Sequence, residues 1–225
     1  MEITWYGHAT FAIKTDNGTV LIDPFFDGNP SAPISWKEVE NCDLILLTHD
    51  HGDHLGQALQ LATKHNVEIV GMFDVIRPLF DQGLPENLGV GMNIGGTVNR
   101  LGIDIQMVQA LHSSVHGAPA GYIITLPDGT CIYDAGDTGL FGDMGLFAEF
   151  HDIDIAILPI GGHFTMDAKQ AAYACKLLKC RTLIPQHWGT FPVLAQNTEA
   201  LAKHLAELAP DTDLNILKIG EPRTF

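Results

Sequence analysis

Basic residues are scarce in this 225-residue chain and never cluster. Only 12 Lys and Arg stand against 27 Asp and Glu, which gives a formal net charge of −15. Tight binding to long nucleic acids needs many Lys or Arg contacts to phosphate, and the sequence has no run that could supply them. An acidic surface also disfavours anionic membranes. We therefore expect neither long nucleic acids nor membranes among the partners.

Long apolar runs and paired cysteines are also absent. No apolar stretch approaches the roughly 20 residues needed to span a bilayer, and residues 2–13 indicate a strand rather than a signal peptide. The four cysteines are scattered without Cys-x-x-Cys spacing, which is typical of small buried residues in a reducing compartment. With 46% hydrophobic residues and no linker, the chain is expected to be cytoplasmic and to form a single domain over residues 1–225.

Strand and helix patterns alternate along the sequence. Apolar or alternating runs that end in turn residues predict strands at residues 3–6, 10–14, 19–22, 43–47, 67–72, 97–100, 103–109, 121–126, 130–134, 153–158 and 182–185. Helical spacing indicates helices at residues 55–65, 75–82, 168–179 and 198–208. The glycine-rich residues 83–96 are expected to be a loop.

Two parts of the sequence resemble each other. Residues 19–24 and the apolar run 42–47 parallel residues 130–135 and the apolar run 153–158. In each part a hairpin strand ends in an aspartate, Asp23 or Asp134, and a fully apolar strand follows, as expected for a strand covered on both faces. We interpret this as an internal duplication in which each half supplies one sheet. The sequence therefore predicts an α/β (α+β) fold, a four-layer αββα sandwich.

Ligand-type side chains gather directly after the apolar run 43–47. Residues 48–56 read Thr-His-Asp-His-Gly-Asp-His-Leu-Gly, and packing gains nothing from three imidazoles and a carboxylate within six residues. His49 and His51 can point the same way from a tight loop, whereas Asp53 and His54 follow at a helix start and can face a second ion. Imidazole and carboxylate groups suit borderline metals such as zinc.

Three further ligand candidates each follow a strand-like run: His112, Asp137 and His187. Two ions about 3.5–4 Å apart can share a bridging carboxylate. Asp137 is suited to that bridge because it lies in a turn with Gly136 and Gly139. His112 would then complete one site and His187 the other.

Residues 49–54, with the sequence His-Asp-His-Gly-Asp-His, resemble the signature loop of the metallo-β-lactamase superfamily, and the later candidates follow in its order His, Asp, His. The resemblance covers essentially the whole chain. Residues 5–11, 134–138, 158–166 and 185–192 look like the small prokaryotic metal-dependent hydrolases similar to ascorbate-6-phosphate lactonase. The resemblance implies a four-layer αββα metallo-β-lactamase sandwich with two divalent ions. Zinc is the metal expected first, and manganese or iron are the alternatives. The resemblance also implies that one ion is held by His49, His51 and His112, and the other by Asp53, His54 and His187, with Asp137 as the bridge.

Such ions imply hydrolysis. Water bound to them ionises near neutral pH, and a bridging hydroxide would attack a small ester, lactone or phosphate-containing substrate. Asp53 can orient this water or accept its proton. His8 and His163, beside glycines at strand ends, are candidates to protonate the leaving oxygen. Asp50 is expected to orient its loop by hydrogen bonds, and Asp23 to support the histidine ligands.

The same ligands leave other reactions open. A phosphodiesterase or nuclease would share them, although the acidic charge disfavours long RNA. An iron-dependent oxidoreductase is a different class: flavin-coupled di-iron relatives typically carry Glu in place of His51, but an iron site that oxidises persulfides stays open because such ligands do not fix the metal. A non-catalytic metal-binding module is disfavoured by the complete ligand set. A small-molecule substrate is expected, and a homo-oligomer is left open.

Overall fold

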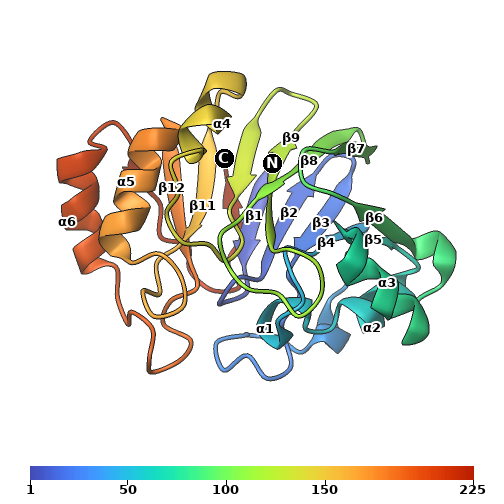
Figure 1. Ribbon diagram of the computed structural model, residues 1–225. Helices are drawn as coiled ribbons and strands as arrows, with labels where there is room; N and C mark the ends of the chain where they lie inside the picture. The colour runs from blue at the N-terminus through green and yellow to red at the C-terminus, as the bar shows by residue number, and fades with distance from the viewer.

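Two seven-stranded sheets face each other in the computed structural model, which describes all residues 1–225 (Figure 1). The first sheet contains, in spatial order, β14 (Arg223–Thr224), β1 (Glu2–Trp5), β2 (Phe11–Thr15), β3 (Gly18–Ile22), β4 (Leu44–Leu46), β5 (Glu68–Met72) and β6 (Gly89–Met92). The second contains β13 (Asp213–Leu214), β12 (Thr182–Gln186), β11 (Ile155–Pro159), β10 (Cys131–Asp134), β9 (Ala120–Thr125), β8 (Ile103–Gln109) and β7 (Thr97–Arg100).

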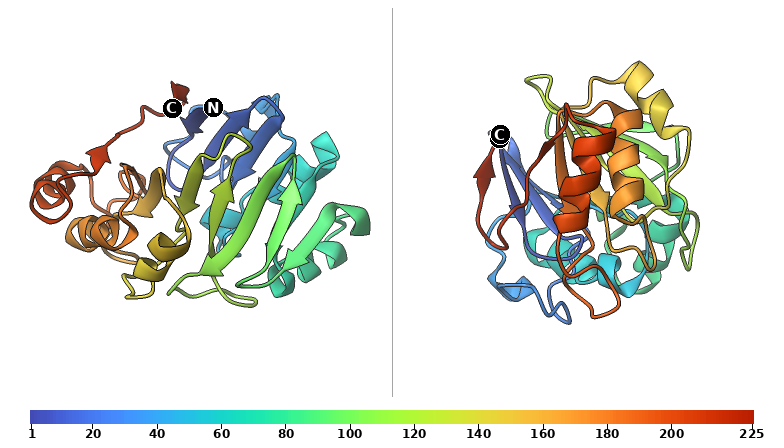
Figure 2. Two further views of the ribbon diagram at one scale, coloured as in Figure 1. Left: turned by 90° about the horizontal axis from the view of Figure 1, so that it is seen from above. Right: turned by 90° about the vertical axis from the view of Figure 1, so that its left-hand side faces the viewer.

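Helices cover the outer sides of both sheets, so that α5 and α6 lie on one side of the molecule and α2 and α3 on the other (Figures 1 and 2). The helices are α1 (Gly52–Leu55), α2 (Ala58–His65), α3 (Phe73–Asp81), α4 (Met144–Phe150), α5 (Ala168–Leu178) and α6 (Glu199–Leu208), with short 3₁₀ turns η1 (Trp36–Glu38) and η2 (Glu86–Leu88). The predicted four-layer sandwich is thereby confirmed. None of the helices combines the length and hydropathy that crossing a bilayer would demand.

The repeated sequence pattern corresponds to a repeated pair of strands. β3 runs parallel to β4, with Leu21 opposite Ile45, and β10 runs parallel to β11, with Tyr133 opposite Ala156. In both pairs the first strand leads into the aspartate that the sequence comparison aligned. Each sheet is antiparallel on one side of this pair and parallel on the other.

Apolar side chains from both sheets form the core between them. β4 is buried along its whole length, which explains its uninterrupted apolar sequence. On β8 alternate residues Ile103, Ile105 and Met107 point inward, and they join side chains of the first sheet in one cluster. Each such side chain contributes about 1.5–3 kcal/mol on burial. The hydroxyl of the buried Tyr122 donates to the carbonyl of Leu47 at 2.6 Å, and this bond fixes the end of β4 where the ligand loop begins.

The structure corrects two expectations. Residues 83–96 were expected to be a loop but include β6, because Gly89 and Gly91 allow α3 to lie directly on this strand: a Cβ atom at Gly91 would come within 2.9 Å of the Phe73 side chain. The helix expected over residues 55–65 is broken at Gly56, whose φ of 43° and ψ of −119° suit only glycine. Helix α4 was not predicted at all.

Candidate metal centre

The predicted ligands converge at one edge of the sandwich because each lies just after the carboxyl end of a strand. The loop after β4 and the first turn of α1 supply residues 49–54, β8 leads to His112, β10 leads to Asp137 and β12 leads to His187. These segments are far apart in sequence but meet where the two sheets open. The structure brings all seven predicted ligand residues together, whereas His163 belongs to none of the groups that could hold a metal ion.

One cluster contains His49, His51 and His112, whose nearest ring nitrogens all lie within 4.8 Å of one another. Nε2 of His49 is 2.9 Å from Nδ1 of His51. The ring of His112 stands edge-on to both, with centroids 5.2 Å and 5.1 Å away. Three imidazoles that present nitrogens to one point match the ligand geometry of a zinc-type ion.

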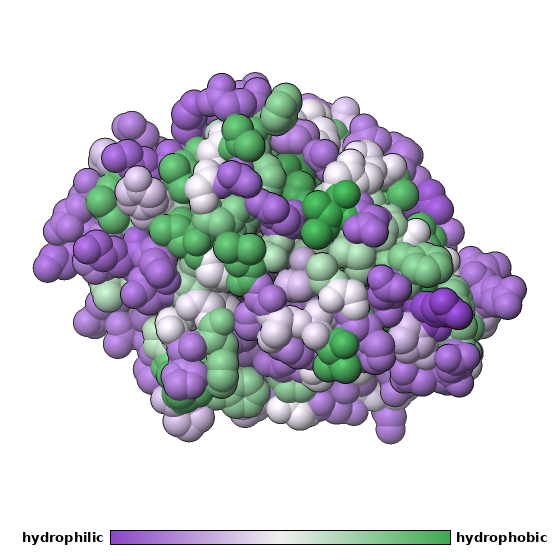
Figure 3. Space-filling view, in the orientation of Figure 1, coloured by the Kyte–Doolittle hydropathy of each residue, from purple (hydrophilic) through white to green (hydrophobic).

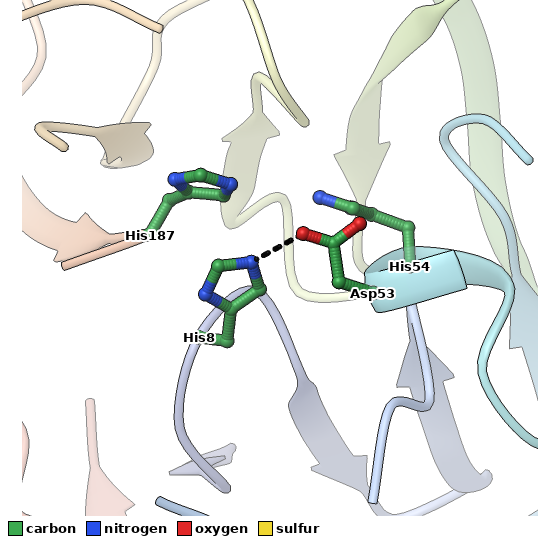
Figure 4. Close-up of side chains that lie close together, drawn as sticks. All are labelled: His8, Asp53, His54 and His187. Atoms are coloured by element: carbon green, nitrogen blue, oxygen red, sulfur yellow. Dashed lines mark hydrogen bonds and ion pairs between the residues drawn. The ribbon is translucent and has the colours of Figure 1, made fainter. Parts of the chain in front are cut away.

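A second cluster joins Asp53, His54 and His187, and it also includes His8 (Figure 4). Nε2 of His8 lies 3.0 Å from Oδ2 of Asp53. The ring of His8 is 4.0 Å from that of His187, centroid to centroid. The sequence placed the first three residues at one ion; the contact between His8 and Asp53 was not foreseen.

One oxygen of Asp137 faces both clusters. Its Oδ2 lies 3.0 Å from Nε2 of His187, 3.4 Å from Nε2 of His54 and 3.6 Å from Nε2 of His112. Its other oxygen, Oδ1, is buried without a hydrogen-bond partner, as is Nε2 of His54. Because buried polar atoms without partners are costly, this arrangement fits cations between the two clusters.

The electrostatics of the site favour neutral His49 and His112 and an ionised Asp137. The carboxylates of Asp137 and Asp23, by contrast, outweigh burial and raise the pKa of His54 well above its usual value. Burial, with the nearby His54, lowers the pKa of His49 to about 2, and burial also lowers the pKa of His112; a neutral imidazole is the form that binds metal. Burial alone would raise the pKa of Asp137, but His54 and His187 outweigh it and hold that pKa well below the usual range. The carboxylate therefore supplies negative charge at the point where the clusters meet.

Supporting hydrogen bonds orient the ligand rings. Thr48 Oγ1 lies 3.0 Å from Nδ1 of His49, and Asp23 Oδ2 lies 2.6 Å from Nδ1 of His54. The Thr48 hydroxyl donates to Asp23 at 2.6 Å and links the two. Each bond occupies the ring nitrogen that faces away from the cluster and leaves Nε2 free to bind a metal. Asp23 thus has the supporting position that the sequence indicated.

The loop after β1 holds His8 rigidly. The residue is fully buried, and its Nδ1 is 3.1 Å from the hydroxyl of Thr190. Burial outweighs the hydrogen bond to the Asp53 carboxylate and lowers the pKa of His8 to about 4. His8, Asp23 and His187 all have positive φ, between 43° and 55°, which is costly outside glycine and is concentrated at functional sites. No local sequence pattern signals these backbone conformations.

Two other predicted residues, His163 and Asp50, lie outside the two clusters. His163 is exposed on the loop after β11, with its ring edge-on to Phe164 at 4.5 Å, and it makes no hydrogen bond. Asp50 accepts hydrogen bonds from Ser114 Oγ at 2.7 Å, from the Val115 amide at 2.7 Å and from the His116 amide at 3.0 Å. Asp50 therefore anchors the loop between β8 and β9, a longer-range role than the orientation of its own loop.

The sequence profile of the beta-lactamase superfamily domain matches residues 18–188, so the chain belongs to this superfamily. The metal-dependent hydrolases within it are more similar still. A "UPF0173 metal-dependent hydrolase" of Nitratidesulfovibrio vulgaris (strain DP4) is 50% identical over 227 residues, which cover 100% of this chain and 95% of that protein. Another, from Caldivirga maquilingensis, is 42% identical over 220 residues, 97% and 96% of the two chains.

A solved structure agrees with the sequence comparisons. Igni18, described as a novel metallo hydrolase of the archaeon Ignicoccus hospitalis, matches with a TM-score of 0.91 and 33% identity over 100% of this chain and 97% of that one. The resemblance of the chain to the metallo-β-lactamase superfamily is thereby confirmed. Like these relatives, the chain is a metal-dependent hydrolase.

Proposed function

We propose that this chain binds two divalent ions and hydrolyses a small ester, lactone or phosphate-containing substrate. His49, His51 and His112 would hold one ion, Asp53, His54 and His187 the other, and Asp137 would bridge them. The observation that supports this assignment best is the position of Asp137 Oδ2, within 3.6 Å of histidine nitrogens from both clusters. Zinc is the metal proposed first because most of the proposed ligands are histidines, with manganese and iron as the alternatives.

Bound ions of this kind polarise the scissile group and make water nucleophilic at neutral pH. The chain's own residues position the reactants. Asp53 is partly exposed, and its Oδ2 is held by His8, so its second oxygen is available to orient a water molecule or to take its proton. His8 is fully buried and bonded at both nitrogens, which favours a positioning role through Asp53. His163 is exposed and makes no hydrogen bond, so its ring is free to donate a proton to a leaving oxygen.

The test replaces the bridging carboxylate. Asp137→Ala should lower the metal content from two ions per chain and abolish turnover of a panel of p-nitrophenyl esters, lactones and p-nitrophenyl phosphodiesters. Metal analysis with an absorption spectrum separates coloured iron from zinc or manganese. Asp152→Ala, which removes an exposed carboxylate without a hydrogen bond, is the matched control and should change neither quantity. An Asp137→Ala protein with two bound ions and full turnover contradicts the assignment.

A further inference from the structure

The segments that carry the metal centre contain no lysine or arginine. The 12 basic residues leave several long stretches without any, among them residues 15–36, 38–63, 101–168 and 182–202. All seven proposed ligands, Asp23 and His163 fall within these stretches, and residues 1–13, which include His8, have no basic residue either. A substrate at the metal centre therefore meets imidazoles and carboxylates but no guanidinium or ammonium group from these loops.

The basic residues with ionic partners are engaged elsewhere. Their partners are carboxylates outside the metal centre, in the pairs Lys14–Glu2, Arg100–Glu68, Lys179–Glu149, Arg181–Asp154 and Lys218–Glu221. Lys169 is the first basic residue after His163 in the sequence. It is exposed in the first turn of α5, beyond the capping residue Asp167. No lysine or arginine forms an ion pair or hydrogen bond with a residue of either cluster.

Exposed apolar side chains lie on the same loops. Leu111 directly precedes His112 and is 56% exposed, and Phe164 directly follows His163 and is 58% exposed. The β8–β9 loop crosses the front of the view in Figure 1, and hydrophobic residues interrupt the polar surface across the middle of the same face in Figure 3. Exposed apolar surface that gathers in one place is typical of a binding surface.

Hydrogen bonds tie these two loops to the loop of Asp137. The Leu111 amide donates to Thr138 Oγ1 at 2.9 Å, and the Gly139 amide donates to the Leu111 carbonyl at 2.9 Å. The Met166 amide donates to the Thr138 carbonyl at 3.0 Å, and the Gly162 amide donates to the Met166 carbonyl at 3.0 Å and closes the loop that carries Phe164. The loops of Leu111 and Phe164 are therefore both tied to the segment that follows Asp137.

From these observations we infer that the substrate has no charged group outside the group that is hydrolysed. We also infer that it carries an apolar group which packs on Leu111 and Phe164. A remote phosphate or carboxylate would need Arg or Lys partners, and the loops supply none. The class that fits is an apolar carboxylic ester or lactone. This inference rests on the proposed function and narrows its substrate.

The reaction balances without a further reactant. The oxygen of water bonds to the acyl carbon, the bond from that carbon to the leaving oxygen breaks, and the proton given up by water ends on the leaving oxygen. An ester thus yields an acid and an alcohol, and a lactone yields a hydroxy acid.

Binding can be tested without turnover. Hexanohydroxamate and adipic monohydroxamate share a metal-binding hydroxamate and a chain of equal length, and they differ in a terminal methyl or carboxylate. In calorimetry with the zinc-loaded protein, the methyl-ended compound should bind at least about tenfold more tightly than the carboxylate-ended compound. Leu111→Lys should reduce or invert this preference. Phe150→Lys, at the equally apolar and 80% exposed end of α4, is the matched control and should leave it unchanged.

Turnover gives the second measurement. After subtraction of the uncatalysed rate, kcat/KM for p-nitrophenyl butyrate should exceed that for p-nitrophenyl hemisuccinate by about tenfold. Phe164→Ser should reduce this ratio of the two kcat/KM values. Equal or preferred binding and turnover of the carboxylate-ended compounds overturns the inference but leaves a metal-dependent hydrolase. A protein that binds neither hydroxamate and cleaves no member of the panel refutes the proposed function as well.

Discussion

The carboxylate of Asp23 lies 2.6 Å from Nδ1 of His54 and accepts a second hydrogen bond, also of 2.6 Å, from the hydroxyl of Thr48. It is buried, with 1% of its surface exposed. Its contacts hold the His54 ring so that Nε2 points towards Asp137. Such a residue controls metal affinity without touching the metal.

Asp23→Asn is therefore expected to weaken metal binding by about 10–100-fold. The amide keeps the shape of the side chain but loses the charge that favours an N–H at Nδ1 of His54. Competition with a chromophoric chelator measures the affinity. Asp27→Asn, on the exposed loop that follows, is the control and should bind metal like the wild type. An unchanged affinity in the Asp23 variant would show that the contact does not orient the ligand.

The ligand loop was readable from the sequence because its chemistry is local. Residues 49–54 place four of the proposed ligands after one buried strand, and the strand pattern put the later candidates at the same edge of the sandwich. The contact of His8 with Asp53 joins residues 45 positions apart, and no periodicity encodes it. Strand β6 was missed for a similar reason: its glycines are required by the close approach of α3, which is a tertiary contact.

The anchoring role of Asp50 leads to a prediction about loop mobility. Burial alone would raise the pKa of Asp50, but hydrogen bonds from Ser114 and His116 outweigh it and lower that pKa, so the anchor is an ionised carboxylate. Hydrogen bonds to charged groups contribute about 1.5–3 kcal/mol each, and Asp50→Ala removes all of them. Hydrogen–deuterium exchange of the residue 113–117 amides should become at least about tenfold faster, with metal content retained.

The turn at residues 127–129, far along the chain from Asp50, serves as the internal control and should exchange at the same rate in both proteins. Exchange that is unaltered in residues 113–117 would mean that the loop is held by other contacts. A loss of metal together with faster exchange would instead extend the role of Asp50 to the ligands His49 and His51 beside it.

Gly56 sets the direction in which the chain leaves α1, the helical turn that carries Asp53 and His54. Its φ of 43° with ψ of −119° is a glycine conformation, and a Cβ atom there would collide with the Pro24 carbonyl and lie 2.6 Å from Cα of Phe25. Gly56→Ala should lower the free energy of unfolding by at least about 1–3 kcal/mol. Gly142→Ala, where an added Cβ meets nothing within 4 Å, should change it by no more than about 0.5 kcal/mol. Denaturant titrations of both variants make the comparison, and equal stabilities would refute the strain at Gly56.

Metal removal should destabilise the whole fold, because the proposed ligands come from both sheets. Without cations, Asp137 Oδ1 and His54 Nε2 are buried polar atoms that lack partners, and a ligand that binds only the native state stabilises it by about 2.7 kcal/mol at about 100 times its Kd. For a chain of this size, each kcal/mol in the free energy of unfolding changes Tm by about 2–4 °C. Thermal unfolding should therefore shift downward with a strong chelator and recover when zinc is restored. In Asp137→Ala the zinc-dependent part of the shift should disappear, since the residue that joins the two clusters is gone. If the wild-type chain melts at one temperature with chelator and with zinc, the clusters do not hold metal in the folded state.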